Sequence, residues 1–410
     1  MRLSVPVGQS FLVRNAKWLS VGVILTFLSS FGQTFFISIF AGEIRTTFGL
    51  SHGAWGSLYS LGTTASAIAM IWAGSLTDLF RVRLLGPVVL VGLALACLSM
   101  AFVNTVWLLP LVIFALRFTG QGMVSHIAVV AMARWFVATR GKALSVALLG
   151  FSLGEALLPI GFVLLLAFVD WRILWMLAAG IALLGLPLLS LLLRQERTPR
   201  DIAAENPSSG MDGRHWTRGQ ALRHPLFWFI IPALLGPSAF NTAFFFHQVH
   251  FAQIKGWAHI ELVAYFPLYT AMSVVAMLAS GWALDRWGTA RLMPVYQLPM
   301  VLSFLAFSWV TDATLAWVGF LFLAMSTGAN STIPNAFWAE FYGTRHIGSI
   351  KAMAAAVMVL GSAIGPGLTG VLIDLGVGLE TQFIAVSVYF LFACMMTWFG
   401  ISRSRTAGAD

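Results

Sequence analysis

The sequence is short of charge and has almost no cysteine. Charged residues make up 10% of its 410 residues, whereas apolar residues make up 59%. A soluble globular domain is typically about 25% charged and about 45–50% apolar. This shortage of charge excludes a soluble globular protein, and the 33 phenylalanines and 16 tryptophans exclude a disordered chain. The sequence therefore predicts an integral membrane protein.

The sequence also lacks the residue clusters of metal sites and active sites. Its two cysteines, Cys97 and Cys394, lie in apolar runs, so they form neither a disulfide framework nor a metal-ligand pattern. There is no Walker A phosphate-binding sequence, which argues against ATP-driven transport. The apolar runs hold no Ser/His/Asp, His-Glu-x-x-His or paired-Asp constellation. We therefore expect no catalytic residues, no metal and no cofactor, and the protein is predicted not to be an enzyme.

Long apolar runs are abundant. A bilayer core of about 30 Å needs about 20 apolar residues in a helix, and we count twelve such runs. They cover approximately residues 19–40, 53–74, 84–104, 107–131, 143–166, 172–194, 226–250, 262–284, 292–311, 315–338, 349–373 and 381–401. No small-residue cleavage site follows an apolar stretch of signal-peptide length, so the first run is predicted to be a retained helix.

The cations are distributed asymmetrically between the connections. If the N-terminus is cytoplasmic, 20 of the 24 Lys and Arg face the cytoplasm, three (Arg45, Arg172 and Lys255) face outward, and Arg117 lies inside a run. This bias predicts a multi-pass protein of the cytoplasmic (inner) membrane with both termini inside the cell. The net charge of +9 then has a topological cause, and we expect no nucleic-acid partner.

One polar stretch divides the chain. Residues 195–224 mix Pro, Ser, Gly and charges of both signs, which is typical of a linker. We therefore predict an N-terminal bundle of six helices at 1–194, a cytoplasmic linker at 195–224, and a C-terminal bundle of six helices at 225–410.

The two halves share landmarks at a constant shift of 207 residues. The matching pairs are Gly74 and Gly281, Asp78 and Asp285, Gly141 and Gly348, Gly154 and Gly361, and Pro159 and Pro366. Matches on corresponding elements indicate parallel repeats, in which two bundles are related by an axis along the membrane normal.

These landmarks carry a resemblance to a known family. Gly74-Ser-Leu-Thr-Asp78-Leu-Phe-Arg81 and Gly281-Trp-Ala-Leu-Asp285-Arg286 resemble the loop motif of the major facilitator superfamily, and the second copy is the closer match. The resemblance covers nearly the whole chain. It implies an all-α fold of twelve transmembrane helices in two six-helix bundles around a central cavity, and transport by alternating access. It also implies a gating role for Gly74, Asp78, Arg81, Gly281, Asp285 and Arg286.

A finer resemblance concerns one branch of that superfamily. The loop Arg140-Gly141-Lys142-Ala143 and the short linker look like the monocarboxylate and oxalate/formate transporters. The cationic residues of that branch in the eighth and eleventh spans are missing here, because the eighth run has no Lys or Arg and Lys351 stands at the start of the eleventh.

Two charged residues lie at mid-membrane depth by their position in the runs. Arg117 is in the fourth run and Glu155 in the fifth, and because these helices are antiparallel the two can face each other. One interpretation is a permanent buried pair that stabilises the first bundle. The other is that Arg117 binds a substrate carboxylate, which its planar fork suits, while Glu155 takes up a proton.

Polar residues in the first, fourth, seventh and tenth runs are candidates for the cavity, since the resemblance implies that these spans line it. They are Gln33, Gln121, Asn241, His247 and Asn330. Gln121 follows Arg117 by four residues, which puts it on the same face of an α-helix. For each of them an interhelical hydrogen bond is the competing interpretation.

We therefore expect a secondary transporter of a small organic solute, most simply a monocarboxylate-like anion, with coupling to protons. The alternative is an efflux pump for hydrophobic or cationic compounds, and a non-transporting receptor or intramembrane enzyme is a third hypothesis. The expected partners are the solute, protons and membrane lipid, and the protein is expected to be a monomer.

Overall fold

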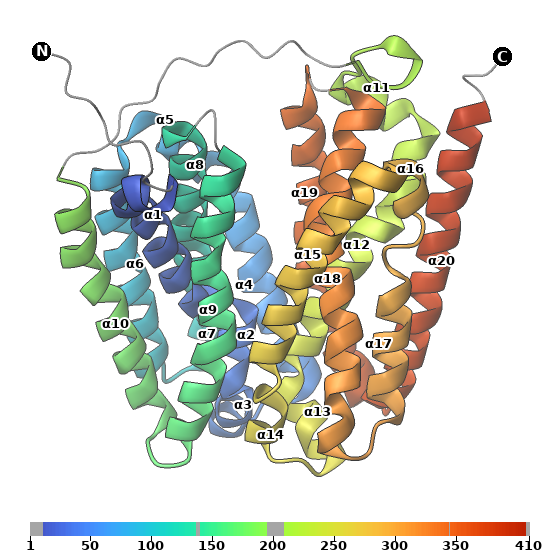
Figure 1. Cartoon of the computed structure of the whole chain (residues 1–410). Coiled ribbons are helices and arrows are strands. Elements are labelled where there is room, and N and C mark those ends of the chain that lie inside the picture. The colour runs from blue at the N-terminus through green and yellow to red at the C-terminus, as the bar shows by residue number, and fades with distance from the viewer. Residues whose placement is uncertain (1–10, 137–139, 195–208, 344, 407–410) are drawn as a thin grey trace, which may run out of the picture. The chain divides into compact units, whose positions relative to one another are not determined.

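The computed structural model describes residues 11–136, 140–194, 209–343 and 345–406, and every regular element in these residues is a helix (Figure 1). The chain forms two compact units. Unit 1 comprises Met1–Phe36, Ala65–Leu158 and Leu165–Ala203, and unit 2 comprises Ile37–Thr64, Pro159–Leu164 and Ala204–Asp410. The predicted division at the linker 195–224 stays a prediction.

Ten helices in the described part of the chain are long and apolar enough to cross a membrane, which confirms the class of fold. They are Phe11–Gly32, Val82–Phe102, Val106–Trp135, Lys142–Leu166, Trp171–Leu192, Pro225–Phe246, His259–Trp287, Ala313–Tyr342, Ile350–Asp374 and Leu379–Ser404. The other two predicted runs coincide with α4 (His52–Ala73) and the shorter α17 (Leu298–Trp309). The count of twelve spans stays a prediction.

The first predicted run is not one continuous helix. Helix α1 (Phe11–Leu28) continues as the 3-10 turn η1 (Ser29–Gly32), and the backbone then becomes extended at Gln33, with φ −87° and ψ 154°. The chain resumes in the short elements α2 (Thr34–Ile37), η2 (Ser38–Phe40) and α3 (Ala41–Phe48). The break interrupts the helical hydrogen-bond pattern after the last bond of η1, from the N–H of Gln33 to the carbonyl oxygen of Ser30.

The ninth run is interrupted as well. Helix α16 (Thr289–Leu292) is followed by turns before α17 begins at Leu298. The sequence Met293-Pro-Val-Tyr-Gln297-Leu-Pro299 accounts for this interruption, because each proline lacks an N–H donor and disfavours a helical conformation in the residue before it.

In unit 1, α6 (Val82–Phe102) packs against α10 (Trp171–Leu192), and α1 packs against α8 (Ser125–Trp135). Helix α9 (Arg140–Leu166) approaches α1 through two glycines. A Cβ atom at Gly150 would lie 2.0 Å from the carbonyl oxygen of Val23, and one at Gly154 would lie 2.0 Å from Oγ of Ser30. Small residues therefore allow close packing between these helices.

Unit 2 repeats that packing. Helix α19 (Ile347–Asp374) packs on α12 (Pro225–Phe246), where a Cβ at Gly361 would lie 2.8 Å from the carbonyl oxygen of Leu235 and one at Gly365 would lie 2.1 Å from that of Ala239. Gly361 is the repeat partner of Gly154, so the constant shift in the sequence corresponds to equivalent helix contacts.

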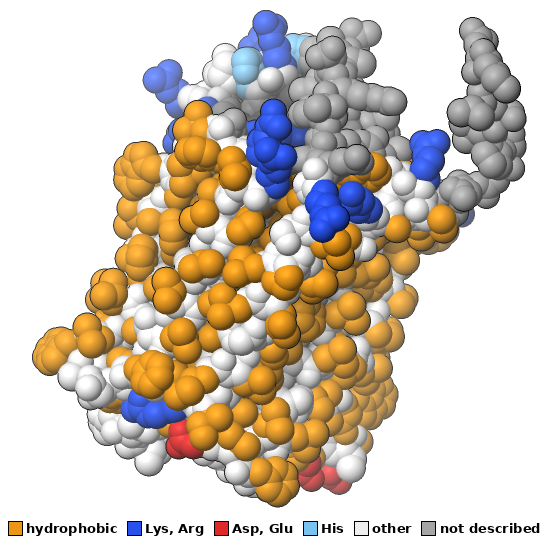
Figure 2. Space-filling model, turned by 90° about the vertical axis from the view of Figure 1, so that its left-hand side faces the viewer, with side chains coloured by type: hydrophobic (Ala, Val, Ile, Leu, Met, Phe, Trp, Pro, Cys, Tyr) orange, Lys and Arg blue, Asp and Glu red, His pale blue; other side chains and the backbone are white. Residues whose placement is uncertain are grey.

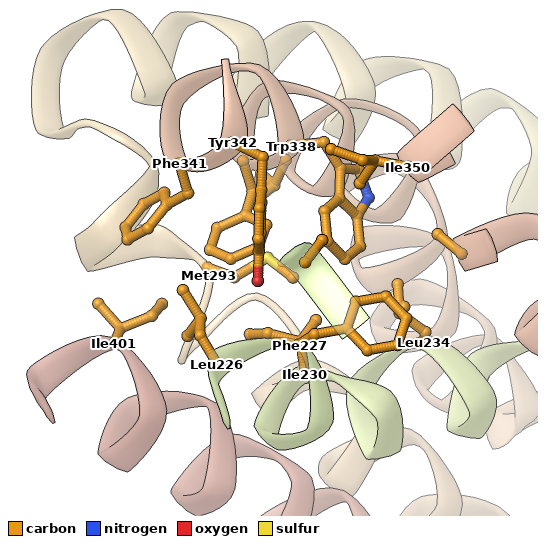
Figure 3. Packing of buried hydrophobic residues seen from close by; sticks show 14 of the residues in the cluster. Leu226, Phe227, Ile230, Leu234, Met293, Trp338, Phe341, Tyr342, Ile350 and Ile401 are labelled. Atoms are coloured by element: carbon orange, nitrogen blue, oxygen red, sulfur yellow. The ribbon is translucent and has the colours of Figure 1, made fainter. Parts of the chain in front are cut away.

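The rest of unit 2 surrounds an aromatic core. Helix α15 (Phe266–Trp287) packs on α18 (Ala316–Tyr342), and α17 packs on α20 (Leu379–Thr406). Figure 3 shows Trp338 and Tyr342 of α18 pointing toward Phe227 and Ile230 of α12 within one buried cluster.

The surface fits a lipid environment. On the face drawn in Figure 2, hydrophobic side chains cover a broad band, and Lys and Arg side chains gather mainly at one end of it. Large exposed apolar side chains include Trp72, Leu188, Trp282, Val388 and Trp398. Such exposure is unfavourable in water and ordinary in a bilayer.

Candidate functional site

Arg117 occupies the centre of unit 1. Its side chain is 1% exposed, and it begins η4 (Arg117–Val124), a π-helical segment between α7 (Leu109–Leu116) and α8. The Nη1 atom donates to the carbonyl oxygen of Gly32 over 3.1 Å and to Oγ1 of Thr34 over 3.3 Å. Arg117 therefore binds both sides of the break in the first run.

Two glycines make this contact possible. A Cβ at Gly120 would lie 2.7 Å from Cα of Gly32, so the backbones of η4 and η1 touch with no room for side chains. The break at Gln33 exposes the C-terminal end of η1, whose carbonyls carry partial negative charge. A buried guanidinium satisfies these acceptors, and π-helical segments of this kind are frequent at functional sites.

Glu155 lies half-buried on α9, next to Gly154 and its contact with Ser30. The expected pairing of Glu155 with Arg117 stays a prediction. Gln33 is buried at the break, whereas Gln121 is exposed. The α-helical spacing predicted one face for Arg117 and Gln121; in this π-helical segment Arg117 is buried and Gln121 is exposed.

Asn241, one of the two candidates in the seventh run, belongs to a polar group that joins three helices of unit 2. Nδ2 of Asn241 on α12 donates to Oγ1 of Thr327 on α18 over 3.3 Å. The hydroxyl of Tyr269 on α15 donates to the same oxygen over 3.3 Å. The buried Oδ1 atom of Asn241 has no hydrogen-bond partner among the described residues. It is therefore an acceptor that can serve a ligand donor.

Asn330 lies in a second polar group, most of which the sequence reading missed. The hydroxyl of Tyr296 donates to Oδ1 of Asn330 over 3.2 Å, and Nε2 of Gln297 donates to the hydroxyl of Tyr296 over 2.8 Å. Gln297 also donates to the carbonyl oxygen of Ala233. Gln297 could have been found from the sequence, because it is a polar residue between two prolines of an apolar run.

His247 lies outside the two groups. It is buried at the end of α12, and its Nε2 is 3.0 Å from the carbonyl oxygen of Pro366. Its ring is 6.1 Å from that of His52, which in turn is 4.0 Å from the ring of His250. Beside them, the carboxylate of Asp374 caps the start of α4. The structure thus places His247 in an interhelical contact.

Comparison of the sequence with known protein families identifies the family of this chain. The sequence profile described as Major Facilitator Superfamily matches residues 22–366. The chain belongs to this superfamily. The initial family assignment is confirmed, and the protein is a membrane transporter rather than an enzyme. The monocarboxylate branch stays a prediction.

Solved transporters of the superfamily share the fold. A bacterial homologue of the human lysosomal transporter Spinster, in an inward-facing and occupied conformation, has a TM-score of 0.75 at 16% identity, with 97% of this chain and 98% of that chain covered. The nucleoside transporter NupG has a TM-score of 0.69 at 15% identity, covering 94% and 99%. No curated protein matches the sequence. At such low identity the likeness concerns the fold alone.

The loop that carries the first copy of the family motif is held by contacts with α8 within unit 1. Nη1 of Arg134 on α8 donates to the carbonyl oxygen of Thr77 in α5 (Leu76–Leu79), and the hydroxyl of Thr77 lies 3.5 Å from Nε2 of His126. Arg81 is exposed, Gly74 begins the turn after α4, and the Asp78 side chain lies outside the described residues. The sequence reading missed Arg134 as a partner of this loop.

The second copy of the motif has a glycine where the first has Arg81. Gly288 ends α15 with φ +74°, a conformation that favours glycine, whereas Arg81 has φ −71°. The first copy, which departs from the family pattern at this position, therefore has a different backbone conformation there. Asp285 and Arg286 are exposed near Gly281, and the Arg286 guanidinium lies 5.8 Å from the ring centroid of Trp282.

Proposed function

We propose that this transporter moves a small organic anion across the cytoplasmic membrane in a proton-coupled cycle. The observation that carries the proposal is the buried Arg117, whose guanidinium binds the two ends of a broken helix through Gly32 and Thr34. A buried cation in a transmembrane segment is costly and is generally functional.

The acceptors that Arg117 binds are ones that an anion can replace. Gly32 offers a neutral carbonyl and Thr34 a neutral hydroxyl. A carboxylate accepts charge-assisted hydrogen bonds that are roughly twice as strong, and it matches the planar fork of Arg. Replacement by a carboxylate would release the two sides of the break, which couples substrate binding to a change in the first span.

Glu155 is the proposed proton carrier. It is half-buried on α9, whose glycines hold it close to the same first span. Entry of an anion beside an ionised Glu155 would bring two like charges together, so uptake of a proton by Glu155 would favour the bound state. In this account proton and anion enter together.

The polar residues of the other spans are proposed to complete the substrate site. Gln33, Gln121, Asn241 and Asn330 are the proposed further substrate contacts, because each offers an amide group that can hydrogen-bond a solute. His247 is a weaker candidate, because its ring already faces the carbonyl of Pro366.

The topology and gating are part of the proposal. The cation distribution supports cytoplasmic termini, and the two loop motifs with Gly74, Asp78, Arg81, Gly281, Asp285 and Arg286 are proposed to stabilise one conformation of the alternating-access cycle. The protein is proposed to act as a monomer within membrane lipid.

A thermal-shift screen of the purified protein tests the substrate class. Small carboxylates, amino acids and amphipathic cations are added at several pH values, and the midpoint of thermal unfolding is measured. We expect a carboxylate to raise the midpoint, with a larger effect at lower pH. Stabilisation by amphipathic cations, with none by carboxylates, would contradict the proposal.

The alternative, an efflux pump for hydrophobic or cationic compounds, has one observation in its favour. Unit 2 holds a cavity of about 280 Å³ with aromatic and aliphatic walls. Phe240, Phe244, Phe304, Phe383 and Tyr389 contribute to its lining, and Gln382 supplies a polar group. Such a lining suits an apolar compound.

Resistance of cells to amphipathic cations separates the two functions. Efflux requires that the wild-type protein confers resistance, that Glu155→Gln removes it, and that carboxylates do not compete. Organic-anion transport predicts no resistance in either strain. Phe304→Ala, in the wall of the cavity, is a second variant that weakens resistance only if the cavity holds the compound.

A further inference from the structure

A hollow of about 600 Å³ lies on unit 2, and none of the proposed substrate contacts is among its lining residues. Its lining comes from the segment after η6 (Met211–Gly213), from α11 (Arg218–Arg223), from the start of α12 and from the connection between α18 and α19. Its lining residues are Arg214, His215, Trp216, Gln220, Arg223, His224, Pro225 and Arg345. The cation distribution predicts that this end faces the cytoplasm.

Three of the lining residues are arginines. Arg214, Arg223 and Arg345 come from three separate segments, and none of their side chains donates a hydrogen bond or forms an ion pair within the described part of the chain. Asp212 lies close enough for its charge to act on His224. The excess of positive charge in the hollow therefore attracts anions.

The walls of the hollow are held in place. The ring of Trp216 meets that of His224 edge-on at 4.9 Å, its Nε1 donates to the carbonyl oxygen of Met211, and its backbone N–H donates to the carbonyl oxygen of Tyr342. Thr217 and Gln220 form a capping box that begins α11. A site built in this way loses little conformational entropy when a ligand binds.

The two histidines add hydrogen-bonding groups, and a helix end adds a favourable dipole. Nδ1 of His224 accepts from the backbone N–H of Leu226, which leaves Nε2 to carry the ring proton, and burial lowers the pKa of His224. Nδ1 of His215 is buried and has no partner among the described residues. The hollow also lies at the N-terminus of the 22-residue helix α12, where anions are favoured.

From this arrangement we propose that the hollow binds a phosphate group. Three guanidiniums that converge from separate segments suit an oxyanion, and Arg in particular binds phosphate through paired N–H donors. The group belongs to an anionic phospholipid of the adjacent leaflet or to a free phosphate compound of the cytoplasm. Basic pockets at the cytoplasmic ends of transmembrane helices recognise lipid headgroups by the same chemistry.

Binding to the purified full-length protein in detergent tests the proposal. The probes are short-chain phosphatidylglycerol, short-chain phosphatidylcholine and inorganic phosphate, and the concentration that half-maximally raises the unfolding midpoint is measured. We expect binding of phosphatidylglycerol or inorganic phosphate, and about fivefold weaker binding in Arg223→Gln and in Arg345→Gln. Preference for phosphatidylglycerol identifies a lipid as the source, and equal binding of inorganic phosphate identifies a free compound.

Arg218→Gln is the matched control, because Arg218 is an exposed cation on the same short helix and does not line the hollow. It should leave the affinity within about twofold of wild type. A loss in Arg218→Gln as large as in Arg223→Gln would attribute binding to general surface charge and overturn the proposal. Equal binding of phosphatidylcholine and phosphatidylglycerol with no binding of inorganic phosphate would also overturn it, and so would wild-type affinity in both Arg223→Gln and Arg345→Gln.

Discussion

Nη1 of Arg117 lies 3.1 Å from the carbonyl oxygen of Gly32, and this hydrogen bond joins the π-helical part of the fourth span to the break in the first. Gly120 and Gly32 bring the two backbones into contact beside it. These features depend on one another. The break supplies a buried acceptor at Gly32, Arg117 supplies the donor, and the glycines let the two backbones come close enough.

Replacement of Arg117 should therefore cost stability before transport is considered. Arg117→Met removes the donor and leaves the carbonyl of Gly32 buried without a partner, which costs about 1–3 kcal/mol. Arg117→Lys retains a positive donor and should lose less. The midpoint of thermal unfolding in detergent measures both variants. Equal midpoints for Arg117→Met and wild type would show that this hydrogen bond does not stabilise the fold.

Two glycines of α9 offer a matched comparison. A Cβ at Gly154 would meet Oγ of Ser30 at 2.0 Å, whereas a Cβ at Gly161 would meet no atom within 4 Å. Gly154→Ala should destabilise the protein by about 1–3 kcal/mol through overpacking, and Gly161→Ala should be neutral or slightly stabilising. Thermal unfolding of the two variants side by side measures the difference. Equal effects would contradict the close approach of α9 and α1.

The carboxylate of Asp374 caps a helix that is distant in sequence. It accepts hydrogen bonds from Oγ of Ser51 at 2.5 Å and from the backbone N–H groups of His52 and Gly53 at 3.1 and 2.8 Å. Asp374→Ala should weaken the start of α4 by about 0.5–2 kcal/mol, and Asp374→Asn, which keeps one acceptor oxygen, by less. Hydrogen exchange of the first turn of α4 measures the loss, and unchanged exchange in Asp374→Ala would refute the cap.

Asn241 and Tyr269 share the acceptor Thr327, so their variants separate binding from stability. Each of these interhelical hydrogen bonds is worth about 0.6 kcal/mol in a membrane protein. Asn241→Leu and Tyr269→Phe should therefore cost similar, small amounts of stability. Only Asn241→Leu should reduce solute uptake by more than about tenfold, since it also removes a proposed ligand contact. Equal uptake by the two variants would assign Asn241 to packing alone.

Much of the fold could be predicted because its signals are local. Runs of apolar residues predicted most of the helices, and the constant shift that relates Gly154 to Gly361 predicted equivalent contacts in the two halves. The loop motifs were sufficient for the family. Each of these features depends on residues near one another in the chain or on simple periodicity.

The breaks could not be predicted in the same way. The extended conformation at Gln33 depends on Gly120 and Arg117, which come from another span, and periodicity carries no information about such contacts. The difference in burial between Arg117 and Gln121, four residues apart in the π-helical segment, was likewise not predicted by α-helical spacing. Asp374 was not chosen as a site residue for the same reason, because its partners at residues 51–53 are remote in sequence.

Uptake of radiolabelled carboxylate into proteoliposomes tests the central claim most directly. The carboxylate is the one that stabilises the protein in the thermal-shift screen, and a proton gradient drives its entry. Wild-type protein should accumulate it, whereas Arg117→Ala and Arg117→Lys should not, although Arg117→Lys retains a folded protein by its unfolding midpoint. Uptake by folded Arg117→Lys or Arg117→Ala at the wild-type rate would contradict the role of Arg117 in binding the anion.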